Sequence, residues 1–92
     1  MIDDILETRQ KTYGSFEDNA HLAQQLKQIM RGSRNWFQLT NTQREGLEMI
    51  QSKIARMLNG DPSYIDNVID IVGYSTLIKK EMERSRVSEM GE

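Results

Sequence analysis

The stretch "EGLEMIQSKIARMLNGDPSYIDNVIDIVGYSTLI", residues 45–78, contains two helical patterns separated by a short break. Apolar residues recur at helical spacing on both sides of the dipeptide Asn59-Gly60. Both residues of that dipeptide tolerate the left-handed conformation at a helix C-terminus. The stretch therefore predicts an antiparallel helical hairpin, with helices over about 40–58 and 62–84.

Two further helices are predicted before the hairpin, over about 2–11 and 16–30. An S-x-x-D signature beginning at Ser15 marks the start of the second of these helices, and a T-x-x-Q signature beginning at Thr40 marks the start of the hairpin. In the last helix, Asp61 is the expected cap, followed by proline in the first turn.

Strand signals are nearly absent, so the expected fold is all-α: a small bundle of three or four helices that ends in the antiparallel hairpin. We expect a single helical domain over 1–85 and a flexible C-terminal tail over 86–92. A chain of 92 residues is near the lower limit for a self-sufficient core. Homo-oligomerisation, as a dimer or a higher oligomer, is therefore expected to complete the bundle.

Composition excludes several classes of function. A net charge of −2 without a basic stripe gives no signal for direct nucleic-acid binding. The absence of cysteine removes disulfides, thiolate zinc sites and cysteine nucleophiles. His21 is the single histidine, which argues against a transition-metal site. No signal peptide and no membrane-spanning run is recognisable, so we expect a cytoplasmic protein without a membrane partner.

Four carboxylates in the hairpin suggest a metal site. Glu45 and Glu48 are three residues apart on one helix, and Asp66 and Asp70 are four apart on the next. Each pair projects from one side of its helix, so two facing pairs would place four carboxylates in one groove. Such charges repel one another unless a hard cation such as Mg²⁺ binds between them. The pattern therefore makes magnesium a candidate cofactor.

An alternative explains the same residues as ordinary ion pairs. Lys53 and Arg56 are on the same helix as the two glutamates and could pair with Asp66 and Asp70 across the hairpin. Ion pairs of this kind are common on helical bundles and contribute about 0–1 kcal/mol each when exposed. Spacing alone does not decide between these two readings.

The ordered set of motifs adds a resemblance. Lys53-x-x-Arg56, followed by D-x-x-x-D-x-x-x-Y from Asp66, resembles the nucleotide modification associated domain, which is often phage-encoded. Small uncharacterised phage proteins with an upstream Tyr-Gly element, here Tyr13-Gly14, are also similar. Both groups look like the all-α nucleotide pyrophosphohydrolase superfamily typified by MazG and dimeric dUTPases. The likeness covers about half of the chain.

That resemblance implies how a site would be built. In the superfamily, E-x-x-E on one helix and E-x-x-D on the next bind magnesium, which orients a nucleoside triphosphate for cleavage to monophosphate and pyrophosphate. Glu45 and Glu48 match the first motif, and Asp70 matches the aspartate of the second. Asp66 is one residue too early, which turns its direction by about 100°.

The resemblance further assigns phosphate contacts to Lys53 and Arg56, a role that suits their charge. Two aromatic residues could stack on a nucleotide base, namely Tyr13 and Trp36. Packing is the simpler explanation for each of them: Tyr13 beneath the following helix, and Trp36 as a cover over the bundle.

Two functions follow. One is a MazG-like nucleotide-binding protein of phage origin in the cytoplasm of a bacterial host, either a Mg²⁺-dependent nucleoside triphosphate pyrophosphohydrolase or a degenerate relative. The other is a non-enzymatic phage accessory protein that binds a host protein through a helical surface. In the second case the four carboxylates are surface and ion-pair residues.

Overall fold

A computed structural model describes residues 2–91 of the chain, and side chains are described for residues 2–86. The helices are α1 (Ile2–Tyr13), α2 (Phe16–Arg31), α3 (Asn41–Asn59) and α4 (Asp66–Gly91), with a short 3-10 helix at Trp36–Gln38. Residues 2–91 include no strand, which confirms the predicted all-α bundle. No helix within this range has both the length and the apolar character needed to cross a bilayer.

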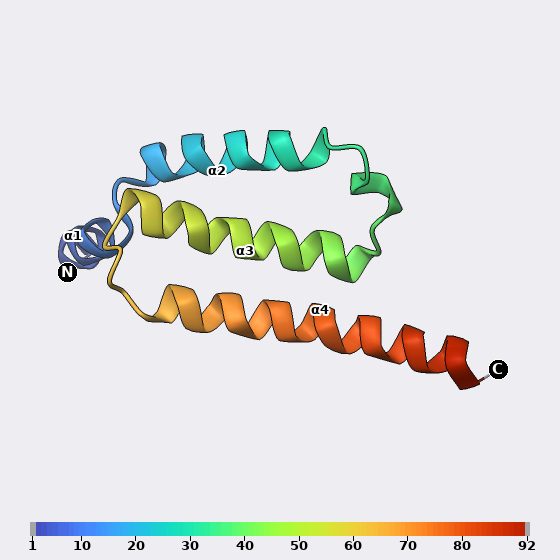
Figure 1. Cartoon of the computed structure of the whole chain (residues 1–92). Coiled ribbons are helices and arrows are strands. Elements are labelled where there is room, and N and C mark those ends of the chain that lie inside the picture. The colour runs from blue at the N-terminus through green and yellow to red at the C-terminus, as the bar shows by residue number, and fades with distance from the viewer. Residues whose placement is uncertain (1, 92) are drawn as a thin grey trace.

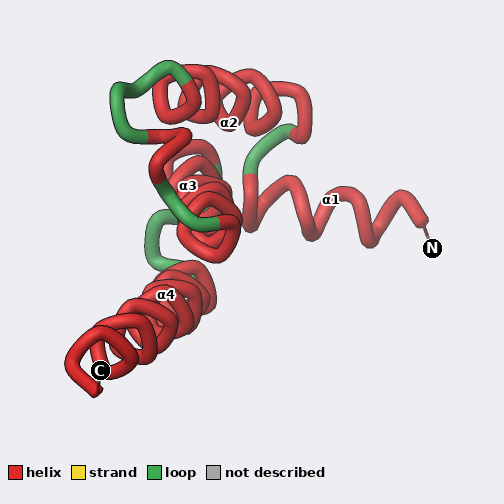
Figure 2. The backbone as a smooth tube through the Cα atoms, turned by 90° about the vertical axis from the view of Figure 1, so that its right-hand side faces the viewer, coloured by secondary structure: helices red, strands yellow, loops and turns green. Residues whose placement is uncertain are grey.

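Three of the helices form one layer, with α3 in the middle (Figure 1). α3 packs against α2 on one side and against α4 on the other. Consecutive helices in the layer run antiparallel, so the predicted C-terminal hairpin is present as α3 and α4. α1 leaves the layer close to the α3–α4 loop and extends away from it (Figure 2).

Local side-chain caps start α2 and α3 where the sequence predicts. The Ser15 hydroxyl accepts a hydrogen bond from the backbone N–H of Asp18 at 3.1 Å. The Thr40 hydroxyl accepts from the N–H of Gln43 at 3.1 Å, and the Gln43 side chain accepts from the N–H of Thr40 at 2.9 Å. The second arrangement is a complete capping box, which satisfies two backbone donors at once.

α4 differs from its prediction at both ends. Asp61 is a turn residue rather than a cap: its carboxylate accepts from the N–H of Ser63 at 2.9 Å, and its own N–H donates to the carbonyl of Thr12 at 2.7 Å. α4 then starts only at Asp66. At the other end the helix passes residue 84 and continues to Gly91, because no glycine or proline lies between these two positions. A separate flexible tail over 86–92 stays a prediction, and Glu92 lies outside the described residues.

The chain buries few apolar side chains. Among the described residues, only Trp36 and Ala55 are buried hydrophobic ones, with 7% and 0% of their surface exposed. Fifteen large hydrophobic side chains within residues 2–86 are exposed instead. A layer one helix thick cannot enclose a core, since each helix has a neighbour on at most two sides.

Candidate functional site

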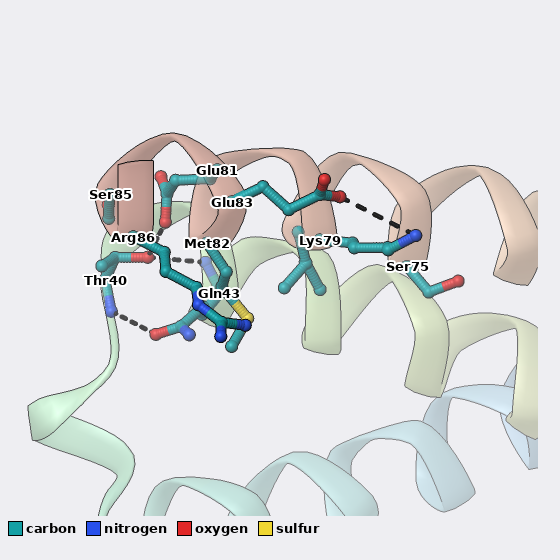
Figure 3. A pocket seen from close by; sticks show the side chains of 10 residues that line it. Thr40, Gln43, Ser75, Lys79, Glu81, Met82, Glu83, Ser85 and Arg86 are labelled. Carbon is teal, nitrogen blue, oxygen red and sulfur yellow. Dashed lines mark hydrogen bonds and ion pairs between the residues drawn. The ribbon is translucent and has the colours of Figure 1, made fainter. Parts of the chain in front are cut away.

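The layer presents two sides, and each has an open groove between α3 and α4. The groove on one side, about 360 Å³, is lined on α3 by Glu45 and on α4 by Leu77. The groove on the other side, about 680 Å³, is lined on α3 by Gln43 and on α4 by Ser75 and Met82 (Figure 3). Residues seven or eleven apart point the same way on an α-helix, so these lining residues show which other side chains share each side.

Most of the predicted site residues share the side of the smaller groove. On α3, Arg56 lies eleven residues after Glu45. On α4, Asp70 and Asp66 lie seven and eleven residues before Leu77. We call the surface formed by Glu45, Arg56, Asp66 and Asp70 the polar face. The structure therefore brings four of the six predicted metal- and phosphate-binding residues to one side of the molecule.

Lys53 of α3 contacts the polar face through an ion pair with Asp70 of α4. Its Nζ lies 3.0 Å from Oδ2 of Asp70, with 10% of the lysine side chain and 45% of the aspartate side chain exposed. In this antiparallel register Arg56, one turn further along α3, lies level with the start of α4 at Asp66. Two cations on α3 and two carboxylates on α4 thus occupy the same two turns. The ion pair itself is the one that the alternative reading predicts.

Glu48 does not belong to the polar face. It accepts two hydrogen bonds from Arg31 of α2, at 3.1 and 2.9 Å. The carboxylate of Glu48 also raises the pKa of that guanidinium, first through the hydrogen bonds and then through charge. The angular position of Glu48 on α3 explains why it contacts α2. It lies about 200° around the helix from Gly46, which contacts Ile78 of α4. A residue so placed points to α2.

The predicted convergence of four carboxylates is wrong for this single chain. No three His, Cys, Asp or Glu side chains gather as a metal-binding group among the described residues. Glu48 is taken by α2, and Glu45 lies eight residues from Lys53, a separation of about 12 Å along α3. Oxygen ligands lie about 2.1 Å from magnesium, so Glu45 and Asp70 cannot share one ion.

The two aromatic candidates contact protein groups. The guanidinium carbon of Arg56 lies 4.6 Å from the centre of the Tyr13 ring, and the ring of Tyr64 meets Tyr13 edge-on with centres 5.9 Å apart. Arg9 lies 6.0 Å from the same ring centre. Trp36 is 7% exposed, which leaves little of its ring open to a base. The burial of Trp36 agrees with the packing alternative, whereas the contacts of Tyr13 are with α1, α3 and the α3–α4 loop, not with the following helix that this alternative named.

The Tyr13-Gly14 element attaches α1 to the hairpin. The side-chain amide of Asn59 donates to the backbone carbonyls of Tyr13 and Ser15, at 3.1 Å each. Gly14 has a φ of +79°, a conformation that favours glycine, and its Cα lies close against Asn59. We call the contact of residues 12–15 with residues 59–61 the clasp. It places Tyr13 beneath Arg56 at the edge of the polar face.

Two polar residues of this region were not predicted from the sequence. Tyr64 lies beside Asp66, which raises the pKa of its phenol. Asn67 is 2% exposed, and its amide nitrogen has no hydrogen-bond partner among the described residues. A buried donor without a partner costs about 1–3 kcal/mol. The sequence does carry one signal for the burial of Asn67. This residue lies four and seven residues before Ile71 and Tyr74, a spacing typical of a buried position.

The titration of Tyr64 is testable. Hydrogen bonds with Asp66 and then with Tyr13, followed by the nearby charge of Asp66, raise the pKa of the Tyr64 phenol to about 12. Because the folded chain favours the protonated phenol, this contribution to stability is complete below pH 10.0, the ordinary pKa, and is lost as the pH rises through about 12. Phenolate absorbance should show one of the three tyrosines ionising near pH 12. That late step should be missing in Tyr64→Phe, and a wild-type curve without it would contradict the prediction.

The fold and the site define a small all-α protein whose helical hairpin places lysine, arginine and two aspartates together. The chain belongs to the family described as Domain of unknown function (DUF6378), whose family model matches residues 3–82. No curated protein and no solved structure matches the chain. The family match contains both the clasp and the polar face, so both are parts of the family domain.

Proposed function

We propose that the chain is a MazG-like nucleotide-binding protein of phage origin, which acts in the cytoplasm of a bacterial host. The phosphates bind to Lys53 and Arg56 on the polar face. The supporting observation is that these two cations and the two carboxylates Asp66 and Asp70 occupy the same two turns of the α3–α4 hairpin. An ion pair joins Lys53 to Asp70, but among the described residues none joins Arg56 to Asp66, so ion pairing accounts for only one cation and one carboxylate of the four.

Magnesium fits this arrangement with two carboxylate ligands from the protein in place of the four first predicted. Mg²⁺ is usually bound by one or two carboxylates and completes its coordination with water and substrate phosphates. Asp66 and Asp70, one helical turn apart, are the two carboxylates that would hold an ion carried in with the phosphates. The ion would neutralise phosphate charge, and Lys53 would then exchange its contact with Asp70 for a phosphate oxygen.

Gly73 supports an open binding surface next to Asp70. It lies four residues before Leu77 and therefore on the same side of α4 as the polar face. A Cβ atom at Gly73 would meet nothing within 4 Å, so packing within this chain does not require the glycine. Glycine inside a helix costs about 1 kcal/mol relative to alanine, and an approaching ligand would account for that cost.

Cleavage of the nucleotide is a further part of the proposal. The resemblance implies release of pyrophosphate from a nucleoside triphosphate. The D-x-x-x-D spacing from Asp66 and the displacement of Glu48 toward α2 leave the chain with fewer metal ligands than that reaction uses in the superfamily. We therefore propose nucleotide binding for this chain, with turnover decided by the pyrophosphate assay below.

The experiment is a thermal shift with a panel of nucleoside triphosphates in the presence of MgCl₂. A nucleotide at a hundred times its Kd should add about 2.7 kcal/mol of stability and raise Tm by roughly 11–22 °C. In Asp70→Asn we expect binding to weaken at least tenfold, because the amide is a poor magnesium ligand. The matched control is Glu83→Gln, which removes an exposed carboxylate whose ion pair with Lys79 is 3.8 Å long.

The outcomes separate the proposals. If no nucleotide shifts Tm or binds in calorimetry, with Mg²⁺ or with Mn²⁺, the nucleotide proposal fails. If Asp70→Asn and Glu83→Gln weaken nucleotide binding equally, the nucleotide does not bind at the polar face. Pyrophosphate released by the wild type and lost in Asp70→Asn would extend the proposal from binding to hydrolysis.

A non-enzymatic accessory protein that binds a host protein remains the second candidate function. The observation that favours it is the number of large hydrophobic side chains that the single chain leaves exposed. A tagged chain that recovers no stoichiometric partner from host lysate would contradict this candidate.

A further inference from the structure

Exposed apolar side chains gather on the side of the layer opposite the polar face. On α3, Leu47, Ile54 and Leu58 lie seven and four residues apart and are exposed. On α4, Val68 and Val72 are exposed at 43% and 59%. We call the surface formed by these five residues the apolar face. All five residues are uncharged, whereas Lys79 and Glu83 lie further along the same side of α4, in the larger groove.

The larger groove shows that α3 and α4 both contribute residues to the side of the apolar face. Gln43 lines this groove from α3, and Leu47 lies one turn after it. Ser75 and Lys79 line the groove from α4, and they lie seven residues after Val68 and Val72 (Figure 3). The groove is therefore the continuation of the apolar face toward the C-terminal half of α4.

The accessible surface of the chain is too large for a self-sufficient fold. It measures 7198 Å². A compact monomer of 10.7 kDa exposes about 5,500 Å², so the excess is about 1,700 Å². The radius of gyration is 16.3 Å, whereas a compact domain of this length has about 12 Å. The excess is as large as the area that each subunit of an obligate homodimer buries.

We infer that the apolar face is a self-association surface, and that its occupant is the apolar face of a second copy of this chain. Two layers packed face to face give each helix of the hairpin a second neighbour and enclose Leu47, Ile54, Leu58, Val68 and Val72 in a common core. The five residues of the apolar face are uncharged, so no like charges meet where the faces of two copies pack about a two-fold axis. The polar face stays outside on both copies, so this inference does not rest on the proposed function.

The first test compares two exposed aliphatic positions on opposite sides of α4. Val72 on the apolar face and Leu77 on the other side are 59% and 57% exposed. Light scattering behind a sizing column should give the wild type about twice the chain mass of 10.7 kDa. Val72→Glu should reduce the mass to that of one chain, or abolish helicity where the free subunit does not fold. Leu77→Glu should remain dimeric and helical.

A second measurement covers the case in which Val72→Glu unfolds. The chain has no cysteine, so single cysteines can be introduced at Ile54, Leu58, Val68 and Val72 without a background reaction. A flexible bis-maleimide should link at least one of these variants into covalent dimers, while Leu77→Cys should stay monomeric in the same gel. The inference is overturned if the wild type has the mass of one chain at all concentrations, if Leu77→Glu dissociates as readily as Val72→Glu, or if only Leu77→Cys is cross-linked.

Discussion

Replacing Gly60 with alanine is expected to lower the free energy of unfolding by about 3 kcal/mol, because the clasp leaves no room for a Cβ atom. That atom would lie 2.5 Å from the carbonyl carbon of Tyr13 and closer still to the carbonyl oxygen of Thr12. Both neighbours are backbone atoms, which cannot rotate away as the end of a side chain can. The turn after α1 would have to separate from Asn59, and Tyr13 from Arg56. The corresponding fall in Tm is roughly 12–24 °C.

Gly32→Ala is the matched control. Gly32 ends α2 with a φ of −86°, and a Cβ atom there would lie 3.3 Å from the nearest atom, the carbonyl oxygen of Gln28. We expect its Tm to change by a few degrees at most. Thermal unfolding should be followed by circular dichroism at one protein concentration, since an oligomer melts in a concentration-dependent way. Tryptic cleavage after Lys11 should become faster in Gly60→Ala alone. Equal Tm values for the two variants would show that the clasp does not hold α1.

Gly46→Ala is expected to cost about 2 kcal/mol, through the contact between α3 and α4. A Cβ atom at Gly46 would lie 2.6 Å from Cδ1 and 2.7 Å from Cγ1 of Ile78. Here the obstacle is a flexible side chain, so the isoleucine can change rotamer or the helices can separate slightly. The cost is therefore smaller than at Gly60, and the expected fall in Tm is roughly 10 °C.

Two comparisons locate this effect. Gly73→Ala should raise stability by about 1 kcal/mol, because its Cβ would meet nothing within 4 Å and alanine favours the helix. In a double-mutant cycle, Gly46→Ala combined with Ile78→Ala should cost less than the sum of the single changes, since the second change removes both contacting atoms. Additive costs, or a destabilised Gly73→Ala, would show that the helix contact is not where the structure places it.

Local signals predicted the fold well, and long-range contacts explain the differences. The caps at Ser15 and Thr40 depend on residues three positions away, so the sequence shows them directly. The predicted start of α4 was wrong: the Asp61 carboxylate closes a turn onto the N–H of Ser63, and its own N–H donates to Thr12 of the clasp, a contact that no local pattern contains. The layer arrangement was also not predictable from periodicity, which shows that a helix has an apolar side but not which neighbour covers it.

The candidate site was predictable residue by residue but not as an assembly. Lys53 and Asp70 were both identified, and the structure pairs them. The sequence placed Glu48 in the same groove because Glu45 and Glu48 are only three residues apart. Helix α2 lies along the flank of α3 that Glu48 occupies, and the two glutamates therefore point to different surroundings. The position of α2 is a tertiary property that helical spacing alone does not contain.

The central position of α3 means that the two sides of this molecule are not mechanically independent. Glu45 and Leu47 are only two residues apart in the sequence, yet they lie on opposite sides of α3, a helix about 10 Å across. Any rotation of α3 about its own axis that turns Glu45 toward α4 also turns Leu47 away from it. Opening one groove then narrows the other. Communication between a ligand on one side and a subunit on the other needs no chain of intermediate residues, since one rigid helix forms part of both.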